Sequence, residues 1–77
     1  MNVTLYSTPT CPFCKQTKAF LTEHQIEFTQ VDVMNDQEQA REMIQKSGQM
    51  GVPVIDIDGQ IVIGFDQKKL KEYLNLK

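Results

Sequence analysis

Two cysteines, Cys11 and Cys14, are the residues of this 77-residue chain best suited to chemistry. They lie three residues apart, a spacing shared by redox-active dithiols and by one half of a zinc site. Three residues along a helix return a side chain to the same face, where Cβ atoms lie about 5 to 6 Å apart. A disulfide requires about 3.5 to 4.5 Å between Cβ atoms, so a small adjustment would join the two sulfurs.

The sequence places Cys11 at the start of a helix. We expect Thr10 to cap this helix and Pro12 to occupy its first turn, where the missing N–H of proline has no partner to lose. Free backbone N–H groups and the helix dipole favour negative charge on a side chain at such a position. Because the thiolate is the attacking form, we predict that Cys11 attacks a disulfide and that Cys14 resolves the mixed disulfide.

The composition argues against several other classes of function. A chain of 77 residues, 40% hydrophobic and 23% charged, fits one globular domain, which we expect to span residues 1–77. A net charge of -2 with dispersed lysines argues against a nucleic-acid partner. The chain shows no export-signal pattern and no apolar run near the roughly 18 residues of a membrane helix. We therefore expect a cytoplasmic protein without a membrane partner, whose cysteines stay reduced at rest, and we expect a monomer.

Patterns along the chain predict seven elements in the order βαβαββα. Alternating or β-branched residues predict strands at residues 1–7, 28–33, 54–57 and 61–63. The second strand has apolar residues at both even and odd positions, which indicates burial on both faces. Helical spacing predicts helices after Thr10, Asn35 and Asp66, each of which can cap the helix that it precedes.

The order of these elements predicts an α/β fold. A β-α-β start requires a right-handed crossover between parallel strands. The turn Asp58-Gly59 tolerates positive φ angles and joins the last two strands into an antiparallel hairpin. We expect Gly48 to end the second helix, and Lys68, Lys69, Lys71 and Lys77 to lie on the outward face of the third. The result is a thioredoxin-like layout, a four-stranded mixed sheet flanked by three helices that cover both faces.

Three motifs in register resemble those of the glutaredoxin family. They are Cys11-Pro12-Phe13-Cys14 after the first strand, Gly51-Val52-Pro53 before the third, and Gly64-Phe65-Asp66 after the fourth. The resemblance spans essentially the whole chain. It implies a dithiol thiol–disulfide oxidoreductase that reduces protein disulfides, serves electron transport and cell redox homeostasis, and has no cofactor beyond glutathione as a possible co-substrate.

The resemblance also implies which residues meet the substrate. It implies a cis peptide bond before Pro53, which then lies against the cysteine pair and leaves the backbone of Val52 free to bind a peptide. On spacing alone, Pro53 would be an ordinary strand-edge proline. The predicted substrate-binding residues are Pro12, Phe13, Lys15, Val52, Pro53, Phe65 and Asp66.

Several of these residues have a second interpretation. Phe13 and Phe65 could present aromatic surface to a docking partner or pack inward. Lys15 could supply a cation to glutathione or be a solvated helix residue. Asp66 could contact a ligand or only cap the last helix.

The electron donor stays open between glutathione and a flavoprotein thioredoxin reductase. Glutaredoxins that use glutathione commonly carry a lysine shortly before the first cysteine, a tyrosine between the cysteines and a threonine before Val-Pro. Here no charged side chain occurs before Cys14, Phe13 stands between the cysteines, and Gly51 precedes Val52. The pair Gly64-Phe65 resembles small redoxins that thioredoxin reductase reduces.

A metal-binding module is the alternative function. A closed zinc site needs two ligands besides the cysteine pair, and the only histidine, His24, belongs to the far end of the same predicted helix. Zinc would therefore require a dimer. An iron–sulfur cluster bridged by Cys11 from two chains, with glutathione as an extra ligand as in some glutaredoxins, is the other form of this alternative.

Overall fold

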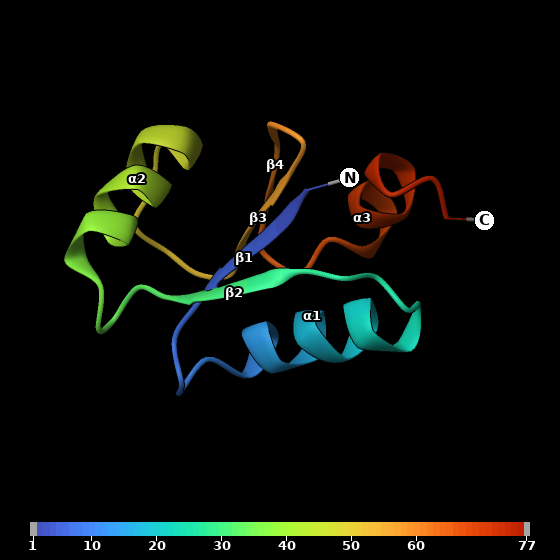
Figure 1. Ribbon diagram of the computed structural model, residues 1–77, viewed down its shortest axis with the longest axis horizontal. Helices are drawn as coiled ribbons and strands as arrows, with labels where there is room; N and C mark the ends of the chain where they lie inside the picture. The colour runs from blue at the N-terminus through green and yellow to red at the C-terminus, as the bar shows by residue number, and fades with distance from the viewer. Residues whose placement is uncertain (1, 77) are drawn as a thin grey trace.

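The computed structural model describes residues 2–76, which form a four-stranded sheet with helices on both sides (Figure 1). The predicted order βαβαββα is confirmed. In chain order the elements are β1 (Val3–Ser7), α1 (Pro12–Glu23), β2 (Thr29–Asp32), α2 (Gln37–Ser47), β3 (Val54–Ile57), β4 (Gln60–Ile63) and α3 (Gln67–Tyr73). Met1, predicted in the first strand, and Lys77, predicted on the last helix, lie outside the described residues.

The sheet is mixed, with strand order β2-β1-β3-β4. Strand β1 pairs in parallel with β2 and antiparallel with β3, and β3 pairs antiparallel with β4. The β3–β4 turn contains Asp58 and Gly59 with φ of 51° and 92°, as the Asp-Gly pair predicts. No helix within residues 2–76 has both the length and the apolar character needed to cross a membrane.

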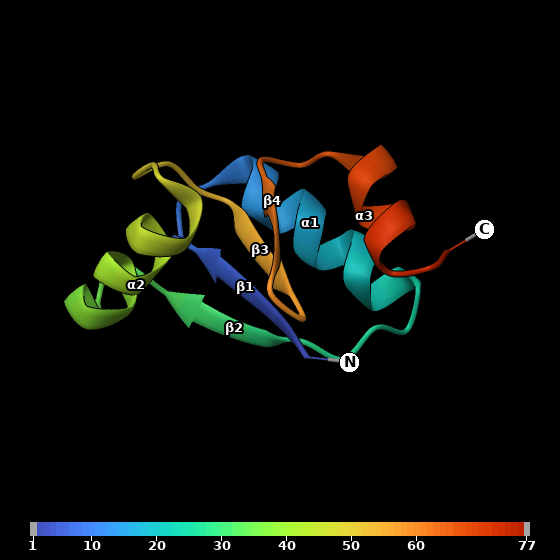
Figure 2. The same cartoon turned by 90° about the horizontal axis from the view of Figure 1, so that it is seen from above.

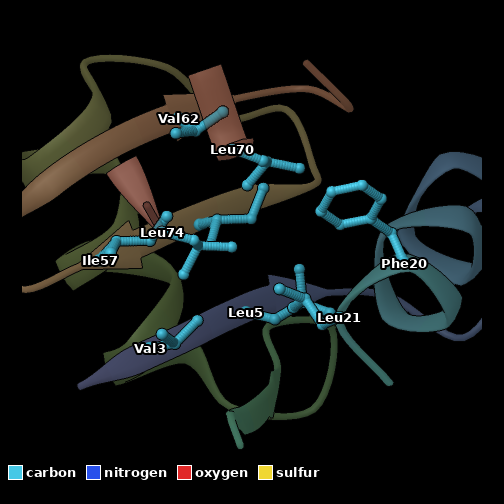
Figure 3. Packing of buried hydrophobic residues seen from close by; sticks show 9 residues of the cluster. Val3, Leu5, Phe20, Leu21, Ile57, Val62, Leu70 and Leu74 are labelled. Carbon is cyan, nitrogen blue, oxygen red and sulfur yellow. The ribbon is translucent and has the colours of Figure 1, made fainter. Parts of the chain in front are cut away.

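Each face of the sheet buries its own hydrophobic cluster. The larger cluster joins the sheet to α1 and α3; Figure 3 shows Leu70 of α3 on the side facing the Phe20 ring of α1, with Leu74 nearer to Ile57. Its members are Val3, Leu5, Phe20, Leu21, Ile55, Ile57, Val62, Leu70 and Leu74. The smaller cluster, Tyr6, Met43 and Val54, lies under α2, on the side opposite to α1 (Figures 1 and 2). Alternate residues of β1 and β3 pack into the two clusters, because successive side chains of a strand point to opposite faces of the sheet.

Strand β2 is buried in part on both faces. Phe28, just before the strand, packs against the larger cluster, whereas Val31 and Val33 pack against the smaller one. This arrangement accounts for the shift of apolar positions along residues 28–33. The strand is one residue shorter at each end than predicted, although the Val33 N–H still donates to the Ser7 carbonyl of β1 at 3.0 Å.

Two of the three predicted helix caps are displaced by one residue. Cys11, and not Thr10, caps α1, and Asp36, and not Asn35, caps α2 by accepting a hydrogen bond from the Gln39 N–H at 3.2 Å. The side chain of Asn35 instead donates to Asp32 Oδ2 at 2.7 Å, so it is committed to the preceding turn. The predicted cap of α3 is confirmed by its bond at 3.2 Å to the Lys69 N–H.

A polar anchor fixes the end of α2 to the sheet. Lys46 Nζ donates to the Tyr6 hydroxyl and to Asp56 Oδ2, both at 3.0 Å, and lies 3.6 Å from Glu42 Oε1. The bonds to Tyr6 and Asp56 raise the pKa of Lys46 above its ordinary value. Because Tyr6 lies on β1 and Asp56 on β3, one side chain ties the helix end to two neighbouring strands.

Gly48 ends α2 in a left-handed conformation with φ of 76°, and its N–H donates to the Ile44 carbonyl at 2.7 Å. A Cβ at this φ is disfavoured by about 1 to 2 kcal/mol. We therefore expect Gly48→Ala to lower the free energy of unfolding by about 1 kcal/mol in urea denaturation. Gly51→Ala is the matched control, because Gly51 lies outside the left-handed region and an added Cβ meets only Gln49 at 3.6 Å. An equal loss in both variants would contradict this explanation.

Candidate active site

The cysteine pair is built into the first turn of α1. Cys11 is the N-cap residue, with φ of -86° and ψ of 112°, and its Sγ accepts a hydrogen bond from the Cys14 N–H at 3.2 Å. Pro12 occupies the first helical position, as predicted. A backbone donor and the positive end of the helix dipole therefore both favour negative charge on the Cys11 sulfur.

Both thiols are free and buried, with 9% of Cys11 and 4% of Cys14 exposed. Burial, followed by the hydrogen bond with Cys11, raises the pKa of Cys14 from 9.0 to about 12, and a backbone hydrogen bond from Thr8 opposes the rise. Cys14 therefore keeps its proton at neutral pH. The two sulfurs are chemically different although they lie in one short motif.

The segment before β3 lies against the cysteine pair. The Val52–Pro53 peptide bond is cis, which confirms what the family resemblance implied. The Cys11 thiol donates to the Val52 carbonyl at 3.8 Å, and Pro53 is buried. The Pro53 carbonyl accepts from the Gly64 N–H at 2.9 Å, so the third motif joins the second. Segments remote in sequence thus meet at Cys11.

Phe13 and Lys15 lie on the exposed side of the α1 start. Phe13 is 57% exposed, so it does not pack inward. Lys15 is exposed in the first turn of the same helix. Both side chains are therefore open to a partner that approaches the cysteines.

Phe65 and Asp66 instead make contacts within the fold. The Phe65 ring is half-buried against the larger cluster and meets the Phe20 ring edge-on at 5.9 Å. Asp66 is half-buried and caps α3. The bond from Gly64 to Pro53 places this segment beside the site, although both side chains serve packing or capping.

Two buried polar residues lie in β1 and α1, and the sequence reasoning assigned no role to either. Ser7 is 2% exposed and accepts a hydrogen bond from Gln30 Nε2 at 3.3 Å. Thr17 is fully buried and donates to the Phe13 carbonyl at 2.8 Å. The sequence signal for Ser7 was the period-two pattern of β1, because Ser7 continues the inward alternation of Val3 and Leu5.

The described residues supply few side chains that could complete a metal site at Cys11 and Cys14. Within residues 2–76, no group of three or more His, Cys, Asp or Glu side chains is placed to hold a metal ion. His24 lies at the opposite end of α1 from the cysteines, with its ring 4.5 Å from that of Phe20. A zinc or cluster site at Cys11 and Cys14 would need ligands from another molecule.

Comparison with known proteins assigns the family. Residues 3–62 match the Glutaredoxin family model. The chain belongs to the glutaredoxin family. This stretch includes the cysteine motif and the segment with the cis peptide bond, so both structural features lie within the family match.

Relatives align along most of this glutaredoxin's sequence. It is 44% identical over 72 residues to a glutaredoxin-like 8.6 kDa protein in the rubredoxin operon of Clostridium pasteurianum, covering 94% of this chain and 96% of that protein. It is 37% identical over 65 residues to glutaredoxin 3 of Escherichia coli (strain K12), covering 84% and 78% of the two chains. The crystal structure of a glutaredoxin from Archaeoglobus fulgidus has a TM-score of 0.88 and 28% identity, with coverage of 95% and 85%.

These findings establish the fold and the class of reaction. The fold is thioredoxin-like, and the glutaredoxin is a thiol–disulfide oxidoreductase. Disulfide substrates and glutathione are consistent with the family. Family membership is compatible with both candidate electron donors, glutathione and a flavoprotein thioredoxin reductase.

The raised pKa of Cys14 predicts a late titration. In Cys11→Ser, burial of Cys14 persists, so we expect its thiolate, followed by ultraviolet absorbance, to form well above pH 9.0. The folded state then holds this proton more tightly than the unfolded state. The contribution to stability is therefore complete below pH 9.0 and is lost as the pH rises through the raised folded-state pKa. The same variant in guanidinium serves as the control. A folded-state midpoint at or below the unfolded one would contradict the prediction.

Proposed function

We propose that this glutaredoxin reduces protein disulfides by a dithiol cycle through Cys11 and Cys14. The supporting observation is the hydrogen bond of 3.2 Å from the Cys14 N–H to Cys11 Sγ at the start of α1. It holds the two residues of the pair in register and favours the charge that an attacking sulfur must carry. Cys11 is the nucleophile, and Cys14 is the resolving thiol.

The cycle moves two electrons to the substrate. The Cys11 thiolate attacks one substrate sulfur, a Cys11–substrate disulfide forms, and the other substrate sulfur leaves and takes up a proton. Cys14 then loses its proton and attacks Cys11 Sγ, which releases the second substrate sulfur as a thiolate that is protonated in turn. The substrate gains two electrons and two protons, and the enzyme ends with a Cys11–Cys14 disulfide.

Cys14 is suited to act second. Its high pKa keeps the Cys14 thiol protonated in the resting enzyme, so Cys14 does not act as the first nucleophile at neutral pH. Attack on the mixed disulfide then needs loss of that proton near the reacting sulfur. The order of the two steps follows from this difference between the thiols.

The substrate chain binds along the cis-proline segment. The Val52 carbonyl faces the Cys11 thiol, which supports docking of an extended peptide against the backbone of Val52 and Pro53. Pro12 and Phe13 add exposed surface at the other side of the pair. Lys15 contributes a cation, whereas Phe65 and Asp66 support the site through packing and capping.

Two electron donors fit this cycle. Two molecules of glutathione can reduce the Cys11–Cys14 disulfide and become glutathione disulfide, or a flavoprotein thioredoxin reductase can deliver two electrons from NADPH. We place the enzyme in the cytoplasm as a monomer, where low-molecular-weight thiols keep its cysteines reduced.

The role assignment predicts different losses for the two cysteines. Cys11→Ser should abolish reduction of an insulin disulfide, because no sulfur remains at the helix cap. Cys14→Ser should form a stable mixed disulfide at Cys11, visible by mass spectrometry, and can keep turnover through a monothiol route with glutathione. Ser47→Ala is the control, since within residues 2–76 the Ser47 hydroxyl bonds with Met43 and Gln49 and not with either cysteine. Equal residual activity in the two cysteine variants would refute the assignment.

The donor is identified by recovery of the oxidised enzyme. One sample receives NADPH with thioredoxin reductase, and the other receives NADPH, glutathione and glutathione reductase. Because no lysine precedes Cys11, we expect recovery with glutathione to be at least several-fold slower than with the reductase. Faster recovery with glutathione would show that this missing cation does not limit the reaction.

A further inference from the structure

We propose that the Lys15–Lys18 face of α1 binds an acidic segment of the partner protein beside its disulfide. The inference rests on the proposed reduction of protein disulfides and adds the class of substrate. It assigns a specificity role to Lys18, which lies outside the cysteine and proline motifs. The supporting features are two adjoining hollows, an unbalanced distribution of charge, and the reach of one hollow to Cys14.

The two hollows lie on either side of the lysine pair. The first has a volume of about 210 Å³ and opens between the β1–α1 loop, α1 and β2; its lining is Thr8, Pro9, Cys14, Lys15, Lys18 and Gln30. The second has a volume of about 520 Å³ and lies along α1; its lining is Lys15, Lys18, Ala19, Thr22 and Glu23. Lys15 and Lys18 line both hollows, so the two hollows adjoin at these side chains.

The charge of this surface is positive at the end near the cysteines. Before Glu23 the sequence contains no carboxylate, and Lys15 and Lys18 are its only charged side chains. Both are exposed, and within residues 2–76 neither side chain forms an ion pair or hydrogen bond. Lys46 differs, because it is bonded to Tyr6 and Asp56. The lysine pair is therefore available to a carboxylate supplied by a partner.

The size of the surface favours a peptide. From Lys15 to Glu23 a helix advances about 12 Å at roughly 1.5 Å per residue. An extended chain advances about 3.3 Å per residue, so about four residues span this distance. Ala19 and Thr22 have small side chains, so the second hollow is shallowly recessed between the lysine pair and Glu23. One small carboxylate would occupy only part of it.

The direction of the segment follows from Glu23. This carboxylate lies at the far end of the second hollow and repels an acidic residue there. The lysine end attracts acidic residues and also adjoins Cys14. A partner should therefore carry its acidic residues close to the reactive disulfide, with neutral or basic residues farther along the chain.

The test uses two synthetic peptides, each with one intramolecular disulfide. They differ only at two positions beside a cysteine, which are Asp-Asp in one peptide and Asn-Asn in the other. We expect the wild-type enzyme to show about a fivefold higher kcat/KM for the Asp-Asp peptide in low salt, as two exposed ion pairs allow. High salt should reduce this preference, because the charges are exposed.

Three variants locate the preference. In Lys15→Gln/Lys18→Gln the ratio of the two kcat/KM values should fall to about one, and in Lys18→Glu it should fall further. The matched control is Lys68→Gln/Lys71→Gln, which removes two exposed cations from α3 and should keep the ratio of the wild type. All lie on exposed helix positions, and circular dichroism checks that each variant folds.

The outcomes separate the two proposals. Equal reduction of both peptides by the wild type, or a preference that survives in Lys15→Gln/Lys18→Gln, would overturn the acidic-segment site alone. If the wild-type enzyme reduces neither peptide, the proposed dithiol function is overturned, and the inference with it. S-methylglutathione, which has carboxylates but cannot react, is added as a competitor. Loss of the Asp-Asp preference at concentrations that leave Asn-Asn reduction unchanged would assign the surface to glutathione and not to a partner segment.

Discussion

The hydrogen bond from the Cys14 N–H to the Cys11 sulfur is the contact around which this glutaredoxin is arranged. It caps α1 and also gives the two thiols different surroundings. For the bond to form, β1 must end at Ser7, and the loop must deliver Cys11 in an extended conformation directly before Pro12. The buried face of α1 then packs on the sheet through Phe20 and Leu21, which fixes the direction of the helix start. Hydrophobic burial thus positions the sulfur, and one backbone donor favours its charged form.

The segment that faces Cys11 is held by contacts from the opposite side of the sheet. Lys46 ties the end of α2 to two strands, and the Gly48 cap turns the chain toward the Val52–Pro53 segment. The carbonyl of Pro53 is bonded to Gly64, just after β4. A loop with few contacts would leave Val52 free to move away from the thiol. Here the helix, the sheet and the following turn restrain it together.

The sequence predicted the element order and the sheet, because periodicity and turn residues are local patterns. The cis bond at Pro53 beside the cysteine pair was implied only by the family resemblance, since spacing alone favours an ordinary strand-edge proline. The sequence patterns placed the first two caps one residue early. Two neighbouring side chains can each accept a bond from a helix start, and only the local turn decides between them; Asn35 is bonded to Asp32, so Asp36 caps α2. The interior contacts of Phe65, the buried role of Ser7 and the hollow at Lys18 depend on residues brought together by the sheet. No short stretch of sequence contains that information.

The sulfur of Cys11 caps the start of α1, so the strength of this cap depends on whether the sulfur is reduced or oxidised. When Cys11 is a thiolate, the start of α1 has a charged acceptor; when the sulfur is bound to Cys14, that charge is gone and the cap is weaker. In the proposed cycle this cap favours the reduced form more than an uncapped dithiol would. Phe13 lies two residues after this sulfur and is exposed to any arriving protein. A donor and an acceptor can therefore distinguish the two states of the enzyme at the first turn of one helix, without a rearrangement of the domain.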